Sequence, residues 1–274
     1  MSRLNTFKTR PKVSPIDLKS YLEKLEVFKE LPSLNYLRKI HRQHLLKIPF
    51  ENLDVHFRNP ITIEIRSIYD KIIPTSRGGF CYELNYLFYH LLVHLGYECQ
   101  LISARVIKGE EMGPEYDHLA ILVKLRDDLY LCDVGFGSGI TYPKKIEENT
   151  LQMDVNQYFQ VTKDENDFYF LNKTTDTLKF ESLYRFELKF REPIEFIDMC
   201  DFHQSNPDST FVGRKIMTKL TEEGRVTLTD DLFTIQELGE RSEYPVLNED
   251  AFYSKMEEHF GISYQSLLQD RLGR

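Results

Sequence analysis

The sequence predicts an α+β protein built from three successive regions. Apolar residues recur at helical intervals through the first third of the chain, so residues 1–96 are expected to form a group of helices. Short runs rich in Val, Ile, Leu and Tyr follow in residues 97–195 and predict strands. The tail, residues 196–274, mixes strand and helix patterns. Helices, then strands, then a mixed tail are typical of an α+β fold.

The helices of the first region have recognisable beginnings and ends. Residues 15–28 carry apolar side chains at helical spacing. Residues 33–48 repeat the pattern and begin at a good N-cap, Ser33. The segment CYELNYLFYHLLVHLG, residues 81–96, is the strongest predicted helix, because it is apolar along most of its length and ends at Gly96.

Strands are expected in the second region and in part of the third. The apolar runs ECQLISARVI, DHLAILVKL and DLYLCDVGF lie between residues 98 and 136. Four segments that alternate apolar with polar residues follow between residues 156 and 192, the last of them ELKFRE. These segments predict an antiparallel sheet or a small barrel. In the tail, strands on either side of the turn EEGR precede an amphipathic helix that ends at Gly261.

Charge and composition exclude several classes of protein. The 274 residues carry a formal net charge of −8, with acidic and basic residues interspersed, whereas nucleic-acid binding needs a basic surface. No segment reaches the ~18 apolar residues of a membrane span. The N-terminus has no apolar stretch of a secretory signal. We therefore expect a cytoplasmic protein with no nucleic-acid or membrane partner and with reduced cysteines. The oligomeric state is not indicated.

The segment SRGGFCYELN, residues 76–85, suggests a nucleophile. Gly78 and Gly79 allow a close approach of the backbone to a substrate. Cys81 then opens the strongest predicted helix, where free N–H groups favour a thiolate and can stabilise an oxyanion. A buried first-turn cysteine with no chemical role is the alternative reading of this pattern.

Two polar residues at strand ends complete a possible catalytic set with Cys81. His118 opens the predicted strand DHLAILV, and Asp133 ends the apolar run LYLC. A thiol needs a base, and a catalytic imidazole is usually oriented by a third group. Taken singly, Asp133 could also be a turn cap. Together the three residues form a Cys-His-Asp set on a helix and a sheet, the arrangement of papain-like thiol enzymes.

No metal site is expected. The four cysteines contain no CxxC pair. His90 and His94 lie four residues apart, like half of an HExxH site, but Leu91 occupies the position of the catalytic Glu. These two histidines are expected to be ordinary helix residues.

Several motifs together closely resemble the arylamine N-acetyltransferase family. They are RGGFCYELN, DHLAILV and LCDVGFG, supported by IPFENLDVH, IYDKII and NPDSTF. The resemblance runs from about residue 34 to the C-terminus. It implies an N-terminal helical bundle over residues 1–96, a central antiparallel β-barrel over 97–195, an α/β lid over 196–274, and a papain-like catalytic core.

The resemblance also implies a mechanism. Cys81 carries the acetyl group, His118 activates Cys81, and Asp133 orients His118. Acetyl-CoA is the co-substrate, and an arylamine, arylhydrazine or arylhydroxylamine is the acceptor, so ping-pong kinetics are expected. No bound cofactor and no metal are required.

Weaker candidates surround these three residues. Phe50, Asp117 and Phe136 are expected to line the acceptor site, and Gly137 and Ser138 to contact CoA, since they follow Asp133 in a glycine-rich turn. Arg77 is expected to pair with a carboxylate behind the site.

Two other functions remain open on the sequence. One is another papain-like thiol enzyme that uses a different acyl donor, such as an acyltransferase, amide synthase, amidase or peptidase, because a Cys-His-Asp set serves them all. The other is a catalytically idle binding protein on the same fold. An acylation assay separates them, because only the transferase releases CoA in response to an arylamine.

Overall fold

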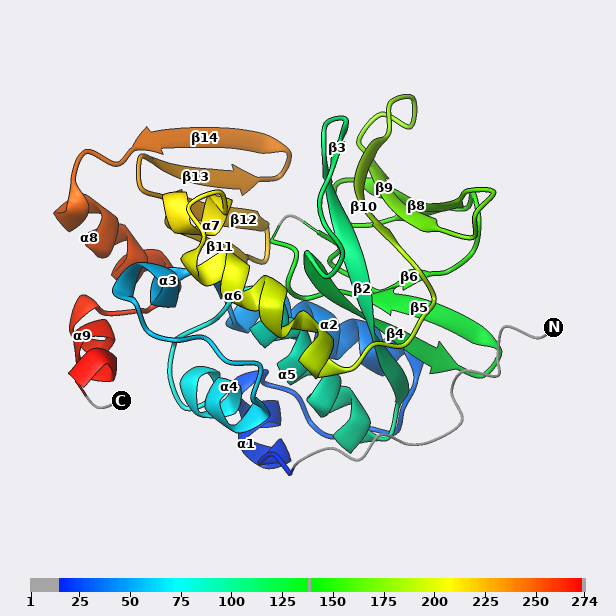
Figure 1. Ribbon diagram of the computed structural model, residues 1–274, viewed down its shortest axis with the longest axis horizontal. Coiled ribbons are helices and arrows are strands. Elements are labelled where there is room, and N and C mark those ends of the chain that lie inside the picture. The colour runs from blue at the N-terminus through cyan, green and yellow to red at the C-terminus, as the bar shows by residue number, and fades with distance from the viewer. Residues whose placement is uncertain (1–14, 138, 273–274) are drawn as a thin grey trace.

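The computed structural model describes residues 15–137 and 139–272, and the chain forms a helical group, a barrel-like sheet and a smaller second sheet (Figure 1). The helical group lies below both sheets in this view. Its helices are α1 (Leu18–Lys24), α2 (Leu34–Lys47), α3 (Leu53–Phe57), α4 (Ile65–Ile72) and α5 (Cys81–Leu95). Ser33 caps α2 by accepting from Tyr36 N–H, and Gly96 ends α5 with a φ of +92°, as the sequence predicts.

The larger sheet is antiparallel and curls into a nearly closed barrel in the strand order β6-β5-β4-β2-β10-β9-β8-β7, with β3 paired to β2. Its strands are β2 (Glu98–Lys108), β3 (Glu111–Met112), β4 (His118–Leu125), β5 (Asp128–Cys132), β6 (Lys144–Lys145), β7 (Leu151–Met153), β8 (Tyr158–Lys163), β9 (Tyr169–Thr174) and β10 (Glu181–Phe186). The prediction of a strand at ELKFRE, residues 187–192, is wrong. This segment is irregular and is followed by Pro193, which starts the short 3-10 helix Pro193–Phe196.

The smaller sheet has the order β1-β11-β12-β13-β14. Its strands are β1 (Phe50–Glu51), β11 (Ile216–Leu220), β12 (Gly224–Thr229), β13 (Leu232–Glu237) and β14 (Glu240–Pro245). The predicted strand pair around EEGR is confirmed as β11 and β12. Helices α6 (Ile197–Ser205) and α7 (Thr210–Gly213) precede β11 in the chain, and α8 (Glu249–Phe260) and α9 (Tyr264–Leu272) follow β14. Because β1 comes from the helical region, this sheet connects that region to the C-terminal part of the chain.

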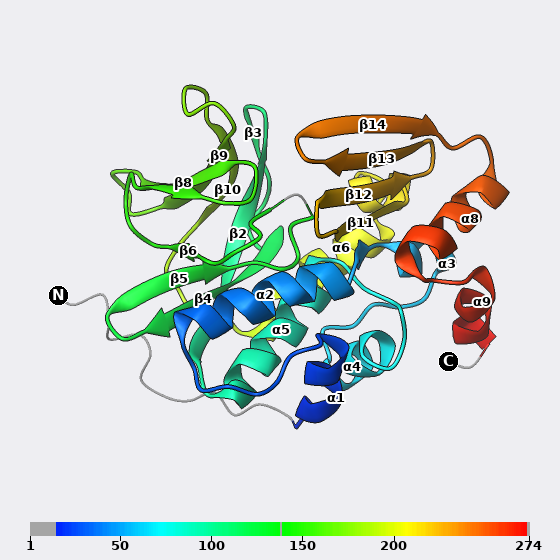
Figure 2. The same cartoon turned by 180° about the vertical axis from the view of Figure 1, so that it is seen from behind.

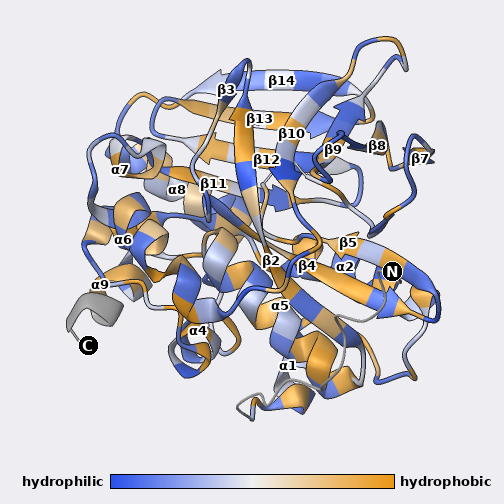
Figure 3. Cartoon of the chain, turned by 45° about the vertical axis from the view of Figure 1, so that its right-hand side comes forward, coloured by the Kyte–Doolittle hydropathy of each residue, from blue (hydrophilic) through white to orange (hydrophobic). Residues whose placement is uncertain are grey.

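Strand β4 is buried on both faces, which explains its continuous apolar sequence (Figure 3). Leu119 and Ile121 face the helices, whereas Ala120 and Leu122 face the inside of the barrel. Figure 2 shows α2 and α5 beneath the barrel on the helical side. Alternation along β4 therefore turns its first residue, His118, toward the barrel side.

The predicted α+β class, with a helical region, a barrel-like antiparallel sheet and a mixed tail, is confirmed. No helix among the described residues is both long and apolar enough to cross a bilayer.

Candidate active site

Cys81 is the first residue of α5 and is buried. The loop before it is held closely by its surroundings. A Cβ on Gly78 would lie 1.8 Å from the carbonyl oxygen of Pro49, so only glycine fits there. The carbonyl of Gly79 accepts a hydrogen bond from Glu51 N–H at 2.9 Å. These contacts hold the loop in place, and the loop in turn fixes the position of Cys81 at the start of α5.

A buried cluster of charges lies behind this loop. Its members are Glu51, Asp54, Lys71, Arg77 and Glu83, all almost inaccessible to water. Arg77 contacts Glu51 at 2.9 Å and Asp54 at 2.8 Å, so the expected pairing of Arg77 with a carboxylate is confirmed. Lys71 joins Asp54 at 2.7 Å to Glu83 at 2.8 Å.

This cluster also caps the nucleophile helix. The second carboxylate oxygen of Glu83 accepts from Phe80 N–H at 3.2 Å, at the residue before Cys81. Burial alone would raise the pKa of Asp54, but the neighbouring Lys71 and Arg77 outweigh burial and lower it. Asp54 thus remains ionised, whereas burial raises the pKa of Glu83 despite its contact with Lys71. The cluster links α3, α4 and the N-terminus of α5.

His118 and Asp133 form a buried pair. The Nε2 atom of His118 lies 2.8 Å from Oδ2 of Asp133, and both residues are 2% exposed. Tyr82 holds the chain just before His118, because its hydroxyl donates to the carbonyl of Tyr116 at 2.8 Å. The pair with Asp133 uses Nε2, so Nδ1 is the nitrogen left for exchanging a proton with a substrate or a thiol.

Asp133 accepts several hydrogen bonds, as a buried carboxylate must. Oδ2 receives the His118 contact and the hydroxyl of Tyr184 at 3.0 Å. Oδ1 receives Asn85 Nδ2 at 2.8 Å and Gly135 N–H at 3.0 Å. Burial by itself would raise the pKa of Asp133, but His118 and these donors outweigh burial and lower it. Asp133 is therefore a carboxylate at neutral pH, suited to orient and stabilise an imidazolium.

Three residues of this network were not identified from the sequence: Asn85, His41 and Tyr184. Asn85 could have been found, because it follows Cys81 by one helical turn and so lies on the same face of α5. Its amide donates to Leu119 O at 2.6 Å and accepts from Val134 N–H at 2.8 Å, which joins the nucleophile helix to both strand ends.

His41, on α2, supports the backbone at Asp133. Its Nε2 accepts from Asp133 N–H at 3.1 Å, and its Nδ1–H donates to Thr141 O at 2.9 Å. Burial lowers the pKa of His41 to about 4, so the ring is neutral and can accept at Nε2. No sequence signal links His41 to a partner so far along the chain.

A cavity of about 320 Å³ connects the candidate residues. Cys81 and His118 line it together, and so do Phe50, Asp117, Phe136 and Gly137. Ser138 lies outside the described residues. Cys132, the residue before Asp133, packs instead into the helical core, as strand alternation predicts.

Burial makes the Cys81 thiol a weaker acid. It raises the pKa of Cys81 well above the ordinary value, and the carboxylate of Asp117 adds to the effect, although an interaction with the Leu119 backbone opposes it. The helix N-terminus was expected to lower the pKa of this thiol, so that expectation is outweighed by desolvation. A thiolate at this site therefore needs a protonated imidazole beside it, and the cavity offers two imidazoles, those of His118 and His203.

The described residues contain no cluster of three His, Cys, Asp or Glu side chains suited to hold a metal ion. A buried thiol, an imidazole and a carboxylate around one small apolar cavity can perform nucleophilic acyl transfer.

Comparisons with known proteins agree with this chemistry. The model of the N-acetyltransferase family matches residues 33–268. The arylamine N-acetyltransferase of Escherichia coli is 29% identical over 84% of this chain and 83% of its own. Human arylamine N-acetyltransferase 1 is 26% identical over 94% of this chain and 98% of its own. The structure of the Mycobacterium marinum arylamine N-acetyltransferase matches with a TM-score of 0.85 and 26% identity, over 93% of this chain and 98% of that one. The resemblance predicted from the motifs is confirmed, and the chain belongs to the N-acetyltransferase family, whose members transfer acetyl groups.

Proposed function

We propose that the protein is an arylamine N-acetyltransferase that moves an acetyl group from acetyl-CoA to an arylamine, arylhydrazine or arylhydroxylamine. The observation that carries the proposal is the shared cavity. The thiol that opens α5 faces the same small space as the imidazole of a buried His–Asp pair.

The first half of the reaction acylates Cys81. The thiol sulfur attacks the carbonyl carbon of acetyl-CoA while His118 takes the thiol proton, and Asp133 stabilises the imidazolium that results. Backbone N–H groups in the first turn of α5, including that of Cys81, are suited to stabilise the oxyanion. The C–S bond to CoA then breaks, His118 returns the proton to the leaving sulfur, and Cys81 holds the acetyl group as a thioester.

The second half transfers the acetyl group to the acceptor. An arylamine is weakly basic and therefore neutral at pH 7, so its nitrogen can attack the thioester directly. His118 takes a proton from this nitrogen, the Cys81–acetyl bond breaks, and the thiol is restored. Because both substrates use one cavity in turn, the kinetics are ping-pong.

Side chains around the cavity suit the acceptor. Phe136 packs edge-on against His118 with ring centroids 5.1 Å apart, and Phe50 lies on the strand beside the nucleophile loop. We assign these rings and Asp117 to the acceptor, and Gly137 with Ser138 to CoA. All four cysteines are free thiols, which agrees with the cytoplasm as the proposed compartment.

The test is an intact-mass measurement after mixing with acetyl-CoA and no amine. The expected result is one acetyl adduct, absent in Cys81→Ala and lost when an arylamine is added. No adduct, combined with selective labelling of Cys81 by iodoacetamide at neutral pH, would point to another acyl donor and to the second class of thiol enzyme. No adduct and no selective labelling would overturn the catalytic assignment.

A further inference from the structure

The backbone at Asp133 is held by side chains from two helices. Strand β5 ends at Cys132, so the backbone N–H groups that follow need other acceptors. The N–H of Asp133 donates to His41 Nε2 at 3.1 Å, and that of Val134 donates to Asn85 Oδ1 at 2.8 Å. Helices α2 and α5 thus supply the acceptors that a neighbouring strand would supply to a longer β5.

His41 also holds the far end of the segment that begins at Asp133. Its Nδ1–H donates to the carbonyl of Thr141 at 2.9 Å. Between these two residues the segment passes against the nucleophile, because a Cβ on Gly135 would lie 2.8 Å from the Cα atom of Cys81. One imidazole therefore bonds both ends of a segment that packs on the nucleophile.

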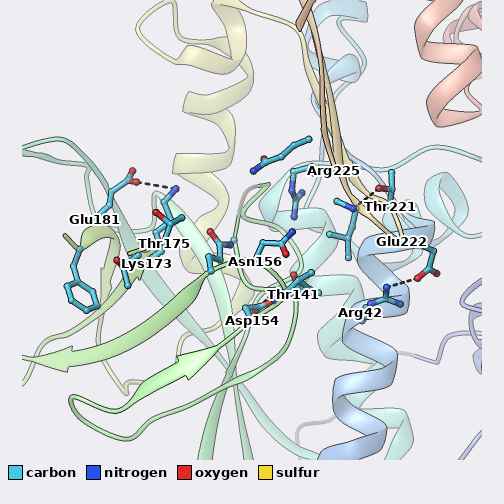
Figure 4. A pocket seen from close by; sticks show the side chains of 18 of the residues that line it. Arg42, Thr141, Asp154, Asn156, Lys173, Thr175, Glu181, Thr221, Glu222 and Arg225 are labelled. Carbon is cyan, nitrogen blue, oxygen red and sulfur yellow. Dashed lines mark hydrogen bonds and ion pairs between the residues drawn. The ribbon is translucent and has the colours of Figure 1, made fainter. Parts of the chain in front are cut away.

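The Thr141 end of this segment has a second attachment. The N–H groups of Thr141 and Tyr142 donate to Asp154 Oδ2 at 3.0 and 3.3 Å, and Asp154 is paired with Lys144 at 2.6 Å. Figure 4 shows Thr141 next to Asp154 at the edge of a larger cavity of about 540 Å³. This end is thus fixed to the barrel, and His41 connects it to the other end.

The two contacts of His41 require a neutral ring in one tautomer. The N–H of Asp133 can donate only to an unprotonated Nε2, and the carbonyl of Thr141 can accept only from Nδ1–H. Burial lowers the pKa of His41 to about 4, and Lys144 adds to the effect, whereas Thr141, Asp133 and Asp154 oppose it. The ring is therefore neutral at pH 7.

We propose that His41 is a positioning residue for the acetyl transfer, because its two hydrogen bonds hold the backbone of Asp133 where the carboxylate meets His118. A catalytic pair keeps its alignment only if the groups behind it are fixed as well. His41 is not among the residues that line the Cys81 cavity, so it acts through Asp133. The inference rests on the proposed function of these residues.

The test is the pH dependence of Cys81 alkylation by iodoacetamide, located by peptide mass. His41→Phe keeps an aromatic ring but offers no donor and no acceptor. Asp133 then stabilises the His118 imidazolium less well, so the thiolate forms only at higher pH. The midpoint is expected to rise by about one pH unit, which makes alkylation and acetylation of Cys81 about tenfold slower at a fixed pH below it.

Two further variants separate hydrogen bonding from packing. His41→Gln carries one acceptor and one donor, and it should restore most of the wild-type midpoint. His44→Phe is the matched control, since His44 lies on the same helix and both rings pack edge-on against Phe88, at 5.7 Å for His41 and 5.3 Å for His44. Neither nitrogen of His44 is hydrogen-bonded within the described part of the chain, so this variant should keep the wild-type midpoint.

A second measurement uses the wild-type protein and does not depend on the folding of a variant. In NMR spectra of protein with 15N-labelled histidine, His41 is expected to stay neutral with its proton on Nδ1 across the pH range of the alkylation profile. A proton on Nε2, or titration of His41 near pH 6.5, would overturn the inference, because the N–H of Asp133 would then have no acceptor.

Three results with folded variants would also overturn it. They are an unchanged midpoint in His41→Phe, an equal shift in His44→Phe, and no recovery in His41→Gln. Failure of the proposed function would look different, because alkylation and NMR need no acyl donor. A wild-type protein that formed no acetyl adduct but gave the expected alkylation profiles would contradict acetyl transfer and leave the role of His41 intact.

Discussion

Two histidine–carboxylate pairs place their histidines in the lining of the same cavity, and the surroundings of the two pairs make them chemically different. In one, His118 Nε2 lies 2.8 Å from Asp133. In the other, His203 Nε2 lies 3.0 Å from Asp117, and His203 Nδ1 also lies 3.1 Å from Ser209 Oγ. Both nitrogens of His203 are therefore occupied, whereas His118 keeps Nδ1 for proton exchange.

The two carboxylates also differ. Asp133 is fully buried and accepts from a tyrosine, an asparagine and a backbone amide in addition to its histidine. Asp117 is only partly buried. A histidine in contact with an aspartate is therefore not by itself a catalytic pair. The free nitrogen and the orienting hydrogen bonds decide which imidazole can move a proton, and both support the proposal that His118 has this role.

His118→Asn should reduce activity more than the other substitutions considered below. Removal of the only imidazole with a free nitrogen in this cavity, among the described residues, should reduce acetyl transfer by about 10³-fold or more, because the buried thiol then loses its proton acceptor. The measurement is the rate of Cys81 acetylation by acetyl-CoA, followed by intact mass, with the thermal midpoint as a check on folding. A folded variant that acetylates within tenfold of the wild type would contradict the assignment.

Asp133→Asn is the next test, with Asp117→Asn as its counterpart. The neutral amide introduced by Asp133→Asn cannot stabilise an imidazolium as a carboxylate does, so a loss of about 10²- to 10³-fold in the acetylation rate is expected. Asp117 contacts a histidine that has no free nitrogen, so its replacement should cost about tenfold or less. Equal losses in the two variants would show that the pairs are not distinguished by their hydrogen bonds.

The sequence predicts the proposed catalytic residues better than it predicts the residues that hydrogen-bond to them. Cys81, His118 and Asp133 stand at the junctions of predicted elements, beside glycines or after apolar runs, so local pattern is enough to find them. Tyr184 and His41 support Asp133 from β10 and α2, at separations of 51 and 92 residues. His203 meets Asp117 across 86 residues. Contacts at such separations depend on how the barrel closes and how α6 packs, which residue patterns do not encode.

Among the secondary-structure elements, too, local features were predicted and long-range pairings were not. Helix ends at Ser33, Gly96 and Gly261 were predicted because their signals are local. The pairing of Phe50 with Thr218 was not, because a two-residue strand has no detectable period. The thiol pKa was also misjudged, since the helix N-terminus is visible in the sequence and the burial of Cys81 is not.

His203→Gln should have a small effect on activity, in contrast to His118→Asn. Glutamine can keep one of the two polar contacts of His203, and no proton transfer through His203 is required. The expected loss in kcat is less than about fivefold, with any larger change confined to the acceptor KM because His203 lines the cavity. The measurement is steady-state kinetics with a saturating acyl donor. If the His203→Gln protein lost as much kcat as His118→Asn, the second pair would have to be included in the mechanism.

The last prediction concerns a histidine that belongs to neither pair. His44 is buried between Tyr21 and Phe88, and neither of its ring nitrogens has a hydrogen-bond partner among the described residues. Burial lowers the pKa of His44 to about 3, with His41 and Lys24 adding to the effect. The unfolded chain therefore binds a proton at about pH 6.5 and the folded protein does not. The free energy of unfolding should fall as the pH is lowered from 6.5 toward 3, by about 2 kcal/mol between pH 6.5 and 5.

His44→Phe removes this titration, keeps an aromatic ring against Phe88, and leaves no polar nitrogen buried. Urea unfolding at pH 7 and pH 5 should show a smaller loss of stability in the variant than in the wild type, with some loss remaining because the pKa of His41 is lowered in the same way. An equal loss in both proteins would mean that His44 becomes hydrated or protonated in the folded state. A reduced loss in the variant would assign that part of the acid sensitivity to the burial of the neutral His44 ring.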